Sequence, residues 1–249
     1  PYYKNLWDKC NVPVSQIKMA DDLSILPIIQ KSAVKEYFED FKSLEYHNFN
    51  PVINRTSGST GKPLEVLVDS RVHSLSNALV WRHYNWAGYK FHHKCVFIDH
   101  PFGFEKGNID KETLYQFDTA KKILKVNSAL INTQTLKELC RIICEYKPDH
   151  IHSYPSLISV FAKYLKNNPH LSIKPKSIIL RAEKLYPHQR RLIESAFQCP
   201  CFELYGQWEY LLFACECEEH NLHLNFELGI CEIIKDGLPC PPGETGEIV

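Results

Sequence analysis

"HIHSYPSLISVFAKYLKNNPHLSIKPKSIILRAEKLYPHQRRLIESAFQCPCFELYG", residues 150–206, decides the fold. Short strand-like runs at 150–154, 177–180 and 201–206 are separated by helix-like segments at 156–168 and 187–197. Pro187 stands at the first turn of the second helix, where its missing N–H is tolerated. Strand–helix–strand–helix–strand over this length predicts right-handed crossovers and a parallel sheet, so we expect an α/β fold.

Neighbouring segments extend this pattern in both directions. A helix is expected at 70–86, with Val72, Leu75 and Leu79 on one face, and a strand at 95–99. A further helix is expected at 133–146, with Thr133 as its cap. The apolar stripes are expected to be Leu136, Leu139 and Ile143 on this helix, and Leu157, Val160, Phe161 and Tyr164 on the helix at 156–168.

Beyond Gly206 the hydrophobic period changes. Residues 222–227 alternate Leu222, Leu224 and Phe226 with polar residues, as a half-buried strand does. Strand and turn signals continue to Val249, so we expect an antiparallel portion at 207–249 after an α/β core at 1–206.

Composition excludes several classes of protein. The 249 residues carry 29 basic and 29 acidic side chains, which leaves no net charge to attract nucleic acid. No run of 18 apolar residues predicts a membrane span, and residues 1–10 do not resemble a signal peptide. The ten cysteines are therefore expected to be reduced thiols in a cytoplasmic protein. Because the chain begins with Pro1 and stops on a strand-like segment, we expect a piece of a longer protein, and an oligomer is possible.

Residues 54–66, "NRTSGSTGKPLEV", look like a phosphate-binding loop. The loop is not a Walker A sequence, because Thr56 stands where that pattern needs Gly and Pro63 follows Lys62. Its hydroxyls, backbone N–H groups and ammonium nevertheless suit a polyphosphate. Composition alone equally allows a flexible polar turn.

The order Thr-Ser-Gly-Ser-Thr-Gly-Lys-Pro at 56–63 resembles the phosphate loop of the adenylate-forming (AMP-binding) superfamily, in its phenylacetate–CoA ligase branch. Residues 1–38 resemble the N-terminal segment of these ligases and of their capsular-polysaccharide-biosynthesis relatives. Similar motifs follow in "RAEKL" (181–185), "ELYGQWEY" (203–210) and "GETGEIV" (243–249). The resemblance covers essentially the whole chain, and it implies the N-terminal large-domain fragment of an adenylate-forming enzyme.

The resemblance also implies an activity. Members of the superfamily join a carboxylic acid to AMP from ATP, release pyrophosphate, and pass the acyl group to a thiol, usually that of coenzyme A. It makes Lys62 and Glu209 the catalytic residues, with Glu209 holding Mg²⁺. The implied ATP/AMP-binding residues are Thr56, Ser57, Gly58, Ser59, Thr60, Gly61, Lys62, Ala182, Glu183, Tyr205, Gly206, Gln207 and Trp208.

Two positions depart from the superfamily pattern. Trp208 stands where Thr or Ser is usual, and Arg181 stands where Gly is usual. An indole offers one N–H donor and much more bulk than a hydroxyl. The alternative to a ligase is therefore a non-catalytic, degenerate AMP-binding fold used for binding or assembly. In either case the 249 residues alone are expected to be poorly active, because the resemblance places half of the closed active site further along the chain.

The resemblance places the acyl pocket at 85–89, 99–104 and 153–157, without naming the acid. Tyr154, Pro155 and Phe102 are equally compatible with an ordinary core.

Five potential zinc ligands lie within 17 residues, namely Cys215, Cys217, His220, His223 and Cys231. The spacing is also compatible with reduced core thiols and a surface histidine. By resemblance to some phenylacetate–CoA ligase relatives, Cys217 and His223 would be ligands of a structural Zn²⁺ that later cysteines complete.

Overall fold

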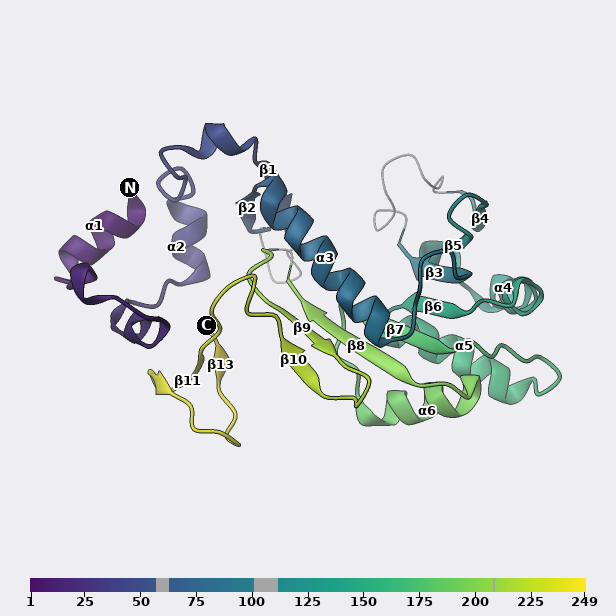
Figure 1. Ribbon diagram of the computed structural model, residues 1–249. Coiled ribbons are helices and arrows are strands. Elements are labelled where there is room, and N and C mark those ends of the chain that lie inside the picture. Colours follow the sequence, from purple (N-terminus) through teal and green to yellow (C-terminus); the bar gives the residue numbers. More distant parts are fainter. Residues whose placement is uncertain (57–62, 101–111, 208) are drawn as a thin grey trace. The chain divides into compact units, whose positions relative to one another are not determined.

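The segment at 150–206 folds as its pattern predicts, within a sheet of eight strands (Figure 1). The computed structural model describes residues 1–56, 63–100, 112–207 and 209–249. These residues form two units. The first unit contains Pro1–Ala78, Gln207–Leu212 and Asn225–Val249, and the second contains Leu79–Gly206 and Phe213–Leu224.

The sheet of the second unit has the spatial order β10-β9-β8-β7-β6-β3-β5-β4. Its central strands β5, β3, β6, β7 and β8 are all parallel, while β4, β9 and β10 pair antiparallel at the two edges. The strands are β3 (Cys95–Asp99), β4 (Tyr115–Asp118), β5 (Ile123–Asn127), β6 (His150–Ser153), β7 (Ser177–Arg181), β8 (Cys201–Gly206), β9 (Phe213–Glu216) and β10 (Leu222–Leu224). The predicted α/β fold with a mostly parallel sheet and an antiparallel portion is confirmed.

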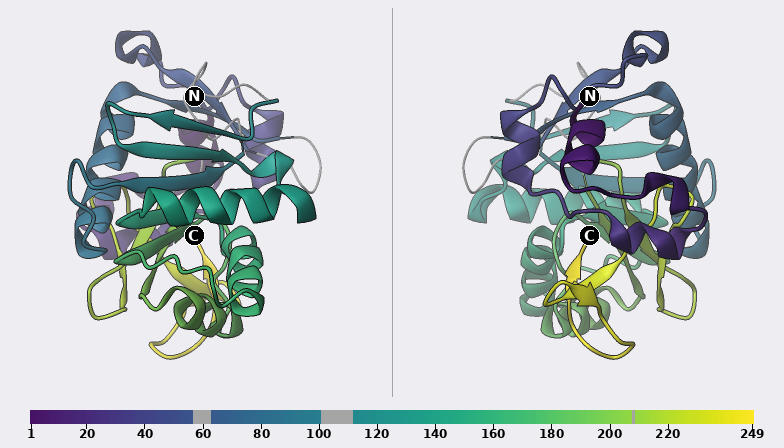
Figure 2. Two further views of the ribbon diagram at one scale, coloured as in Figure 1. Left: turned by 90° about the vertical axis from the view of Figure 1, so that its right-hand side faces the viewer. Right: turned by 90° about the vertical axis from the view of Figure 1, so that its left-hand side faces the viewer.

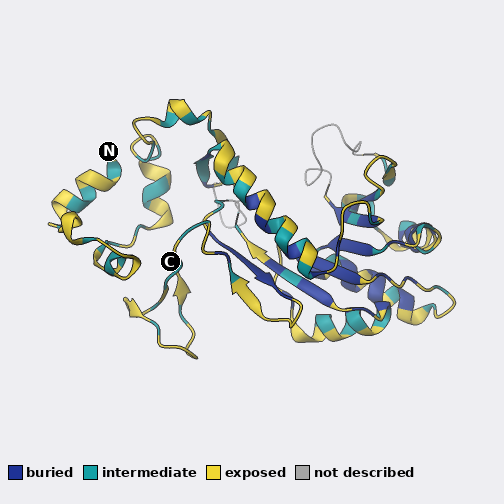
Figure 3. Ribbon diagram, in the orientation of Figure 1, coloured by how far each residue is buried: buried dark blue, intermediate teal, exposed yellow. Residues whose placement is uncertain are grey.

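Helices cover both faces of this sheet (Figures 1 and 2). One face packs against α4 (Thr133–Tyr146), α5 (Pro155–Asn167) and α6 (Pro187–Phe197). The other face packs against the second half of α3 (Ser70–Trp86) and the turn that follows it. In Figure 3 the central strands are almost wholly buried, whereas the helices are buried along one stripe and exposed along the other.

The structure corrects two expectations about the helices, the cap of α4 and the buried face of α5. Asn132, and not Thr133, caps α4, because its side chain accepts hydrogen bonds from the backbone N–H groups of Gln134 and Thr135 at 2.9 and 3.1 Å. Thr133 is the first helical residue. On α5 the expected inward residue Val160 is exposed, and Ile158, Ala162 and Leu165 are buried instead, beside Phe161.

The edge strand β10 is shorter and more exposed than its alternation predicts. Leu222 is 53% exposed and Phe226, beyond the strand, is 70% exposed, while the polar Asn225 is buried. The burial predicted for Leu222 and Phe226 is therefore wrong. An edge strand with one neighbour offers little cover to its apolar face.

The first unit is built from short elements. It contains α1 (Tyr2–Lys9), α2 (Lys31–Glu36), the hairpin β1 (Val52–Arg55) and β2 (Glu65–Val68), and the first half of α3. A separate three-stranded sheet has the order β12-β11-β13, with β11 (Ile233–Lys235), β12 (Leu238–Pro239) and β13 (Glu247–Ile248). All ten cysteines are free thiols. Among the described residues, no helix is both long enough and apolar enough to cross a bilayer.

Candidate functional site

The strand order of the second unit reverses between β3 and β6. From β3 the chain builds β4 and β5 on one side, and then β6, β7 and β8 on the other. In open α/β sheets ligands bind outside the carboxyl ends of the strands at such a reversal. Asp99 ends β3 and Ser153 ends β6, so this strand end is the candidate site.

Asp99 ties three strand ends together. Its buried carboxylate accepts hydrogen bonds from the Arg181 guanidinium at the end of β7 and from the Tyr154 hydroxyl just beyond β6. It also accepts the backbone N–H of His100 at 2.7 Å. Burial and the bond to Asp99 raise the pKa of Tyr154. The Arg181 side chain is 36% exposed, and its guanidinium carries five N–H donors.

Two further polar side chains, His152 and Tyr84, lie near Asp99 and Arg181 on the face of the sheet that packs against α3. His152 is buried, and the Tyr84 hydroxyl lies 3.4 Å from its Nε2 atom. Burial, Arg181 and His83 together hold the pKa of His152 well below its ordinary value. His152 is therefore a neutral imidazole at neutral pH.

His83 is fully buried on the inner side of α3, four residues after Leu79. Neither ring nitrogen has a hydrogen-bond partner among the residues that the structure describes. Burial lowers the pKa of His83 to about 4. We name His83, Tyr84, Asp99, His152, Tyr154 and Arg181 the strand-end cluster.

Sequence reasoning reached only part of this cluster. Asp99 and Tyr154 fell within the predicted acyl-pocket segments, and Arg181 was singled out as a departure, but His83, Tyr84 and His152 were missed. Two signals mark the missing histidines in hindsight. The stripe through Leu79 continues one turn to His83, and His152 lies next to Ile151 in a short strand whose four residues are all buried.

The turn after β7 is held in a fixed shape. Ala182 has a φ of +65°, a conformation that non-glycine residues adopt rarely. The Glu183 carboxylate accepts hydrogen bonds from the backbone N–H and the hydroxyl of Ser156, at 2.9 and 2.8 Å, in the first turn of α5. A carboxylate there satisfies an otherwise unpaired N–H group and meets the positive end of the helix dipole. Glu183 thus has a structural partner, and its contact with adenine stays a prediction.

Most of the predicted phosphate loop lies outside the described residues, and only its base can be placed. Thr56 and Leu64 face each other across the hairpin. The Thr56 N–H donates to the Leu64 carbonyl at 3.0 Å, and the Leu64 N–H donates to the Thr56 hydroxyl at 2.9 Å. The loop therefore connects two paired antiparallel strands. The predicted nucleotide-site residues outside the described part are Ser57, Gly58, Ser59, Thr60, Gly61, Lys62 and Trp208. Residues 101–104 of the predicted acyl pocket, with Phe102, also lie outside it.

The other predicted nucleotide residues lie at and after the end of β8. Tyr205 is exposed, and Gly206 closes the strand. A Cβ atom at Gly206 would lie 2.9 Å from the Phe213 ring on β9, so this glycine permits a close strand contact. Gln207 and Glu209 lie in the segment Gln207–Leu212, which belongs to the first unit.

The predicted zinc ligands lie on the β9–β10 hairpin. The Cys217 N–H donates to the Asn221 carbonyl, and His223 pairs with Cys215 across the hairpin. Across the described residues, no group of three or more His, Cys, Asp or Glu side chains is placed to hold a metal ion. Cys217 and His223 therefore offer two ligands there, where a structural zinc site needs four.

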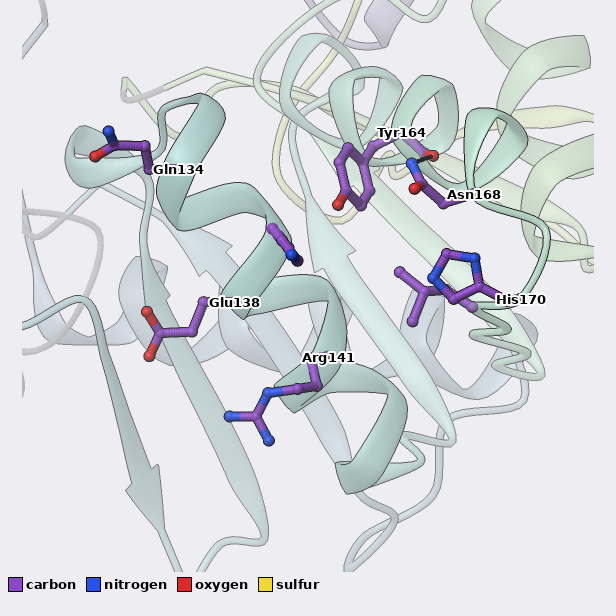
Figure 4. A pocket seen from close by; sticks show the side chains of 8 residues that line it. Gln134, Glu138, Arg141, Tyr164, Asn168 and His170 are labelled. Atoms are coloured by element: carbon purple, nitrogen blue, oxygen red, sulfur yellow. Dashed lines mark hydrogen bonds between the residues drawn. The ribbon is translucent and has the colours of Figure 1, made fainter.

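A hollow of about 570 Å³ lies away from the strand ends, between α4 and the end of α5 (Figure 4). No member of the strand-end cluster lines it. Its lining residues are Gln134, Lys137, Glu138, Arg141, Tyr164, Asn168, His170 and Leu171.

Comparisons with known proteins agree with this geometry. No protein-family model matches the chain. Protein CapK of Staphylococcus aureus is 28% identical over 123 residues, which is 49% of this chain and 27% of CapK. The structure of 2-hydroxyisobutyryl-CoA ligase in an open conformation, with 2-HIB-AMP and CoA, superposes with a TM-score of 0.68. It is 15% identical, and the match covers 100% of this chain and 60% of the ligase.

A malonyl-CoA ligase with methylmalonyl-CoA and AMP bound gives a TM-score of 0.53 at 16% identity, over 80% of this chain and 43% of the ligase. The chain thus has the fold of adenylate-forming acyl-CoA ligases, and the resemblance predicted from the sequence is confirmed at the level of fold. The chain spans 60% or less of each of these relatives.

Proposed function

We propose that this chain is the nucleotide- and acid-binding portion of an AMP-forming acid–thiol ligase of the phenylacetate–CoA ligase type. The observation that carries the proposal is the ordered phosphate-loop sequence at 56–63, in a chain with the fold of acyl-CoA ligases. The ligases with this fold were solved with acyl-adenylate, AMP or CoA bound. ATP and coenzyme A are the corresponding substrates here.

The chemistry divides between the two units. In the first unit, the hydroxyls of Ser57, Ser59 and Thr60 and the Lys62 ammonium would bind the β- and γ-phosphates, where charge develops as pyrophosphate leaves. Glu209 fits Mg²⁺ because a carboxylate oxygen is the ligand that this ion prefers, and the ion would neutralise phosphate charge.

In the second unit, the turn Ala182–Glu183 and the strand end at Tyr205 and Gly206 would bind the adenosine. The aromatic ring of Tyr205 is exposed and can stack on the base. Gln207 and Trp208 follow directly in the chain. The carboxylic acid would enter beside the strand-end cluster.

The test is acid-dependent exchange of pyrophosphate into ATP by the full-length protein, with a panel of acids. Lys62→Ala should lower the exchange rate by about 10²–10³-fold, because a charge that stabilises the transition state is removed. Lys174→Ala, which removes an exposed lysine of the second unit, is the matched control. Full exchange by Lys62→Ala would contradict the assigned role of this lysine.

The rival function is a non-catalytic AMP-binding fold used for binding or assembly, and Trp208 favours it. Calorimetric titration of the full-length protein with ATP and Mg²⁺ separates the two functions. Absence of nucleotide binding at millimolar concentration would favour the rival. Binding without exchange for any acid would favour a protein that retains the nucleotide site and has lost the chemistry.

A Zn²⁺ ion at Cys217 and His223 would be shown by elemental analysis, and Cys217→Ser should then lose the metal.

A further inference from the structure

The strand-end cluster puts hydrogen-bonding groups where the fold binds its ligand. All six members belong to the second unit. Asp99, His152, Tyr154 and Arg181 come from strand ends at or beside the reversal between β3 and β6, whereas His83 and Tyr84 come from α3 and lie near His152. Buried faces of parallel sheets are ordinarily apolar. Here, Asp99 and His152 replace apolar residues on the face that packs against α3, and α3 adds His83 and Tyr84.

The hydrogen-bonding capacity of the cluster is only partly used. Asp99 already accepts hydrogen bonds from Arg181, Tyr154 and the His100 N–H. By contrast, His83 is fully buried and both its ring nitrogens lack a partner among the described residues. A neutral imidazole offers one N–H donor and one acceptor. Leaving both unpaired in a buried position is unfavourable, so a polar ligand group or water is expected beside this ring.

We propose, resting on the proposed function, that the strand-end cluster is the specificity site of the ligase and selects a short carboxylic acid that bears a hydroxyl group. The hydroxyl can donate to one imidazole nitrogen and accept from an imidazole N–H or from an N–H group of Arg181. An alkyl or aryl acid would bury the same groups without partners.

The charges argue against a second carboxylate on the acid. The Arg181 guanidinium is already balanced by the Asp99 carboxylate, and both histidines are neutral. A second anion would therefore enter a site without net positive charge, beside a buried carboxylate. A neutral hydroxyl meets no such repulsion, and the partly exposed Arg181 side chain can donate to it.

The experiment compares matched acids in pyrophosphate–ATP exchange by the full-length protein. Butyrate is paired with 2-, 3- and 4-hydroxybutyrate, and phenylacetate with mandelate. The preferred hydroxy acid should exceed its unsubstituted partner in kcat/KM by about 100-fold or more, because sites built around a substrate hydroxyl discriminate strongly against its absence. Succinate should be a poor substrate.

Variants connect the preference to the cluster. His83→Leu and Arg181→Leu should each reduce the hydroxy-acid preference at least tenfold, mainly by raising KM for the hydroxy acid. Tyr84→Phe, which removes one hydroxyl and keeps the ring, is the gentler variant if either of these fails to fold. Ser159→Ala removes a buried hydroxyl on the opposite face of the sheet and should leave the ratio unchanged.

The outcomes separate this inference from the proposed function. Exchange that proceeds equally with butyrate and the hydroxybutyrates would overturn the inference and leave the ligase function intact. A preference that survives in His83→Leu, Arg181→Leu and Tyr84→Phe would also overturn it. Absence of exchange with every acid, together with absence of ATP binding, would overturn the proposed function itself.

Discussion

The two faces of the sheet in the second unit are built from the same strands and differ in chemistry. Strand β6 shows the contrast within three residues, because Ile151 faces α4–α6 while His150 and His152 face α3. In β3, Ile98 belongs to the apolar cluster beneath α4–α6, whereas Asp99 belongs to the strand-end cluster. The α4–α6 face holds a large cluster of buried apolar side chains. Its charged groups lie toward β9, where the Arg190 guanidinium of α6 donates to the buried Glu216 carboxylate at 2.8 and 2.9 Å.

This difference separates stability from function within one sheet. The apolar cluster of the α4–α6 face gains its free energy from apolar burial, which is insensitive to pH. The α3 face buries titratable groups, which cost free energy unless they are paired. If a ligand uses the titratable groups of the α3 face, substitutions on the two faces should differ in their effects on stability, on its pH dependence and on acid preference.

The largest expected effect is the loss of stability in acid, which should come from the α3 face. Burial lowers the pKa of both His83 and His150 to about 4 in the folded protein. In the unfolded chain, the pKa of a histidine is about 6.5. The unfolded state therefore binds more protons below that pH, and each histidine should remove about 3 kcal/mol of stability between pH ~6.5 and ~4.

Urea unfolding over this pH range measures the effect. His83→Leu should flatten the curve by about 1.4 kcal/mol per pH unit, because one proton-linked site is removed. His188→Ala, which removes an exposed histidine at the start of α6, is the control and should leave the slope unchanged. A wild-type stability that is flat from pH ~6.5 to ~4 would show that the buried histidines are not linked to folding.

The next effect belongs to the α4–α6 face. Phe161 is fully buried in α5 within the apolar cluster. Phe161→Ala should lower the free energy of unfolding by about 3–5 kcal/mol, since it removes a large apolar side chain and leaves a cavity. The loss should be the same at every pH. A pH-dependent loss would mean that the α4–α6 face and the titratable groups of the α3 face are coupled.

A smaller effect is expected for the turn after β7, which contains Glu183. Glu183→Ala removes the carboxylate that accepts from the N–H and hydroxyl of Ser156, and it should lower stability by about 1–2 kcal/mol. Glu183→Gln keeps one acceptor oxygen and should lose about half of that. Titration of both variants with ATP then shows whether the affinity for nucleotide falls by more than this loss of stability explains.

The fold could be predicted from the sequence because each crossover has its own signals. Pro187 marks a helix start, and the apolar run Ile178–Leu180 marks a buried parallel strand. The strand-end cluster could be predicted only in part, because its members are 98 residues apart from His83 to Arg181 and meet through the strand order. The boundary of α4 shows the same limit locally, since Asn132 and Thr133 are both good caps and only the hydrogen bonds distinguish them.

The smallest effect decides how the α3 face should be understood. Near neutral pH, His83→Leu should leave the free energy of unfolding unchanged or raise it by about 1 kcal/mol, because an unpaired buried imidazole is replaced by an apolar side chain of similar size. Differential scanning calorimetry of the wild type and the variant measures it. Stabilisation accompanied by loss of the hydroxy-acid preference would identify a residue kept for binding at the expense of stability. Destabilisation by more than about 1 kcal/mol would instead mean that His83 is paired in the folded protein, and that the α3 face contributes to stability as the α4–α6 face does.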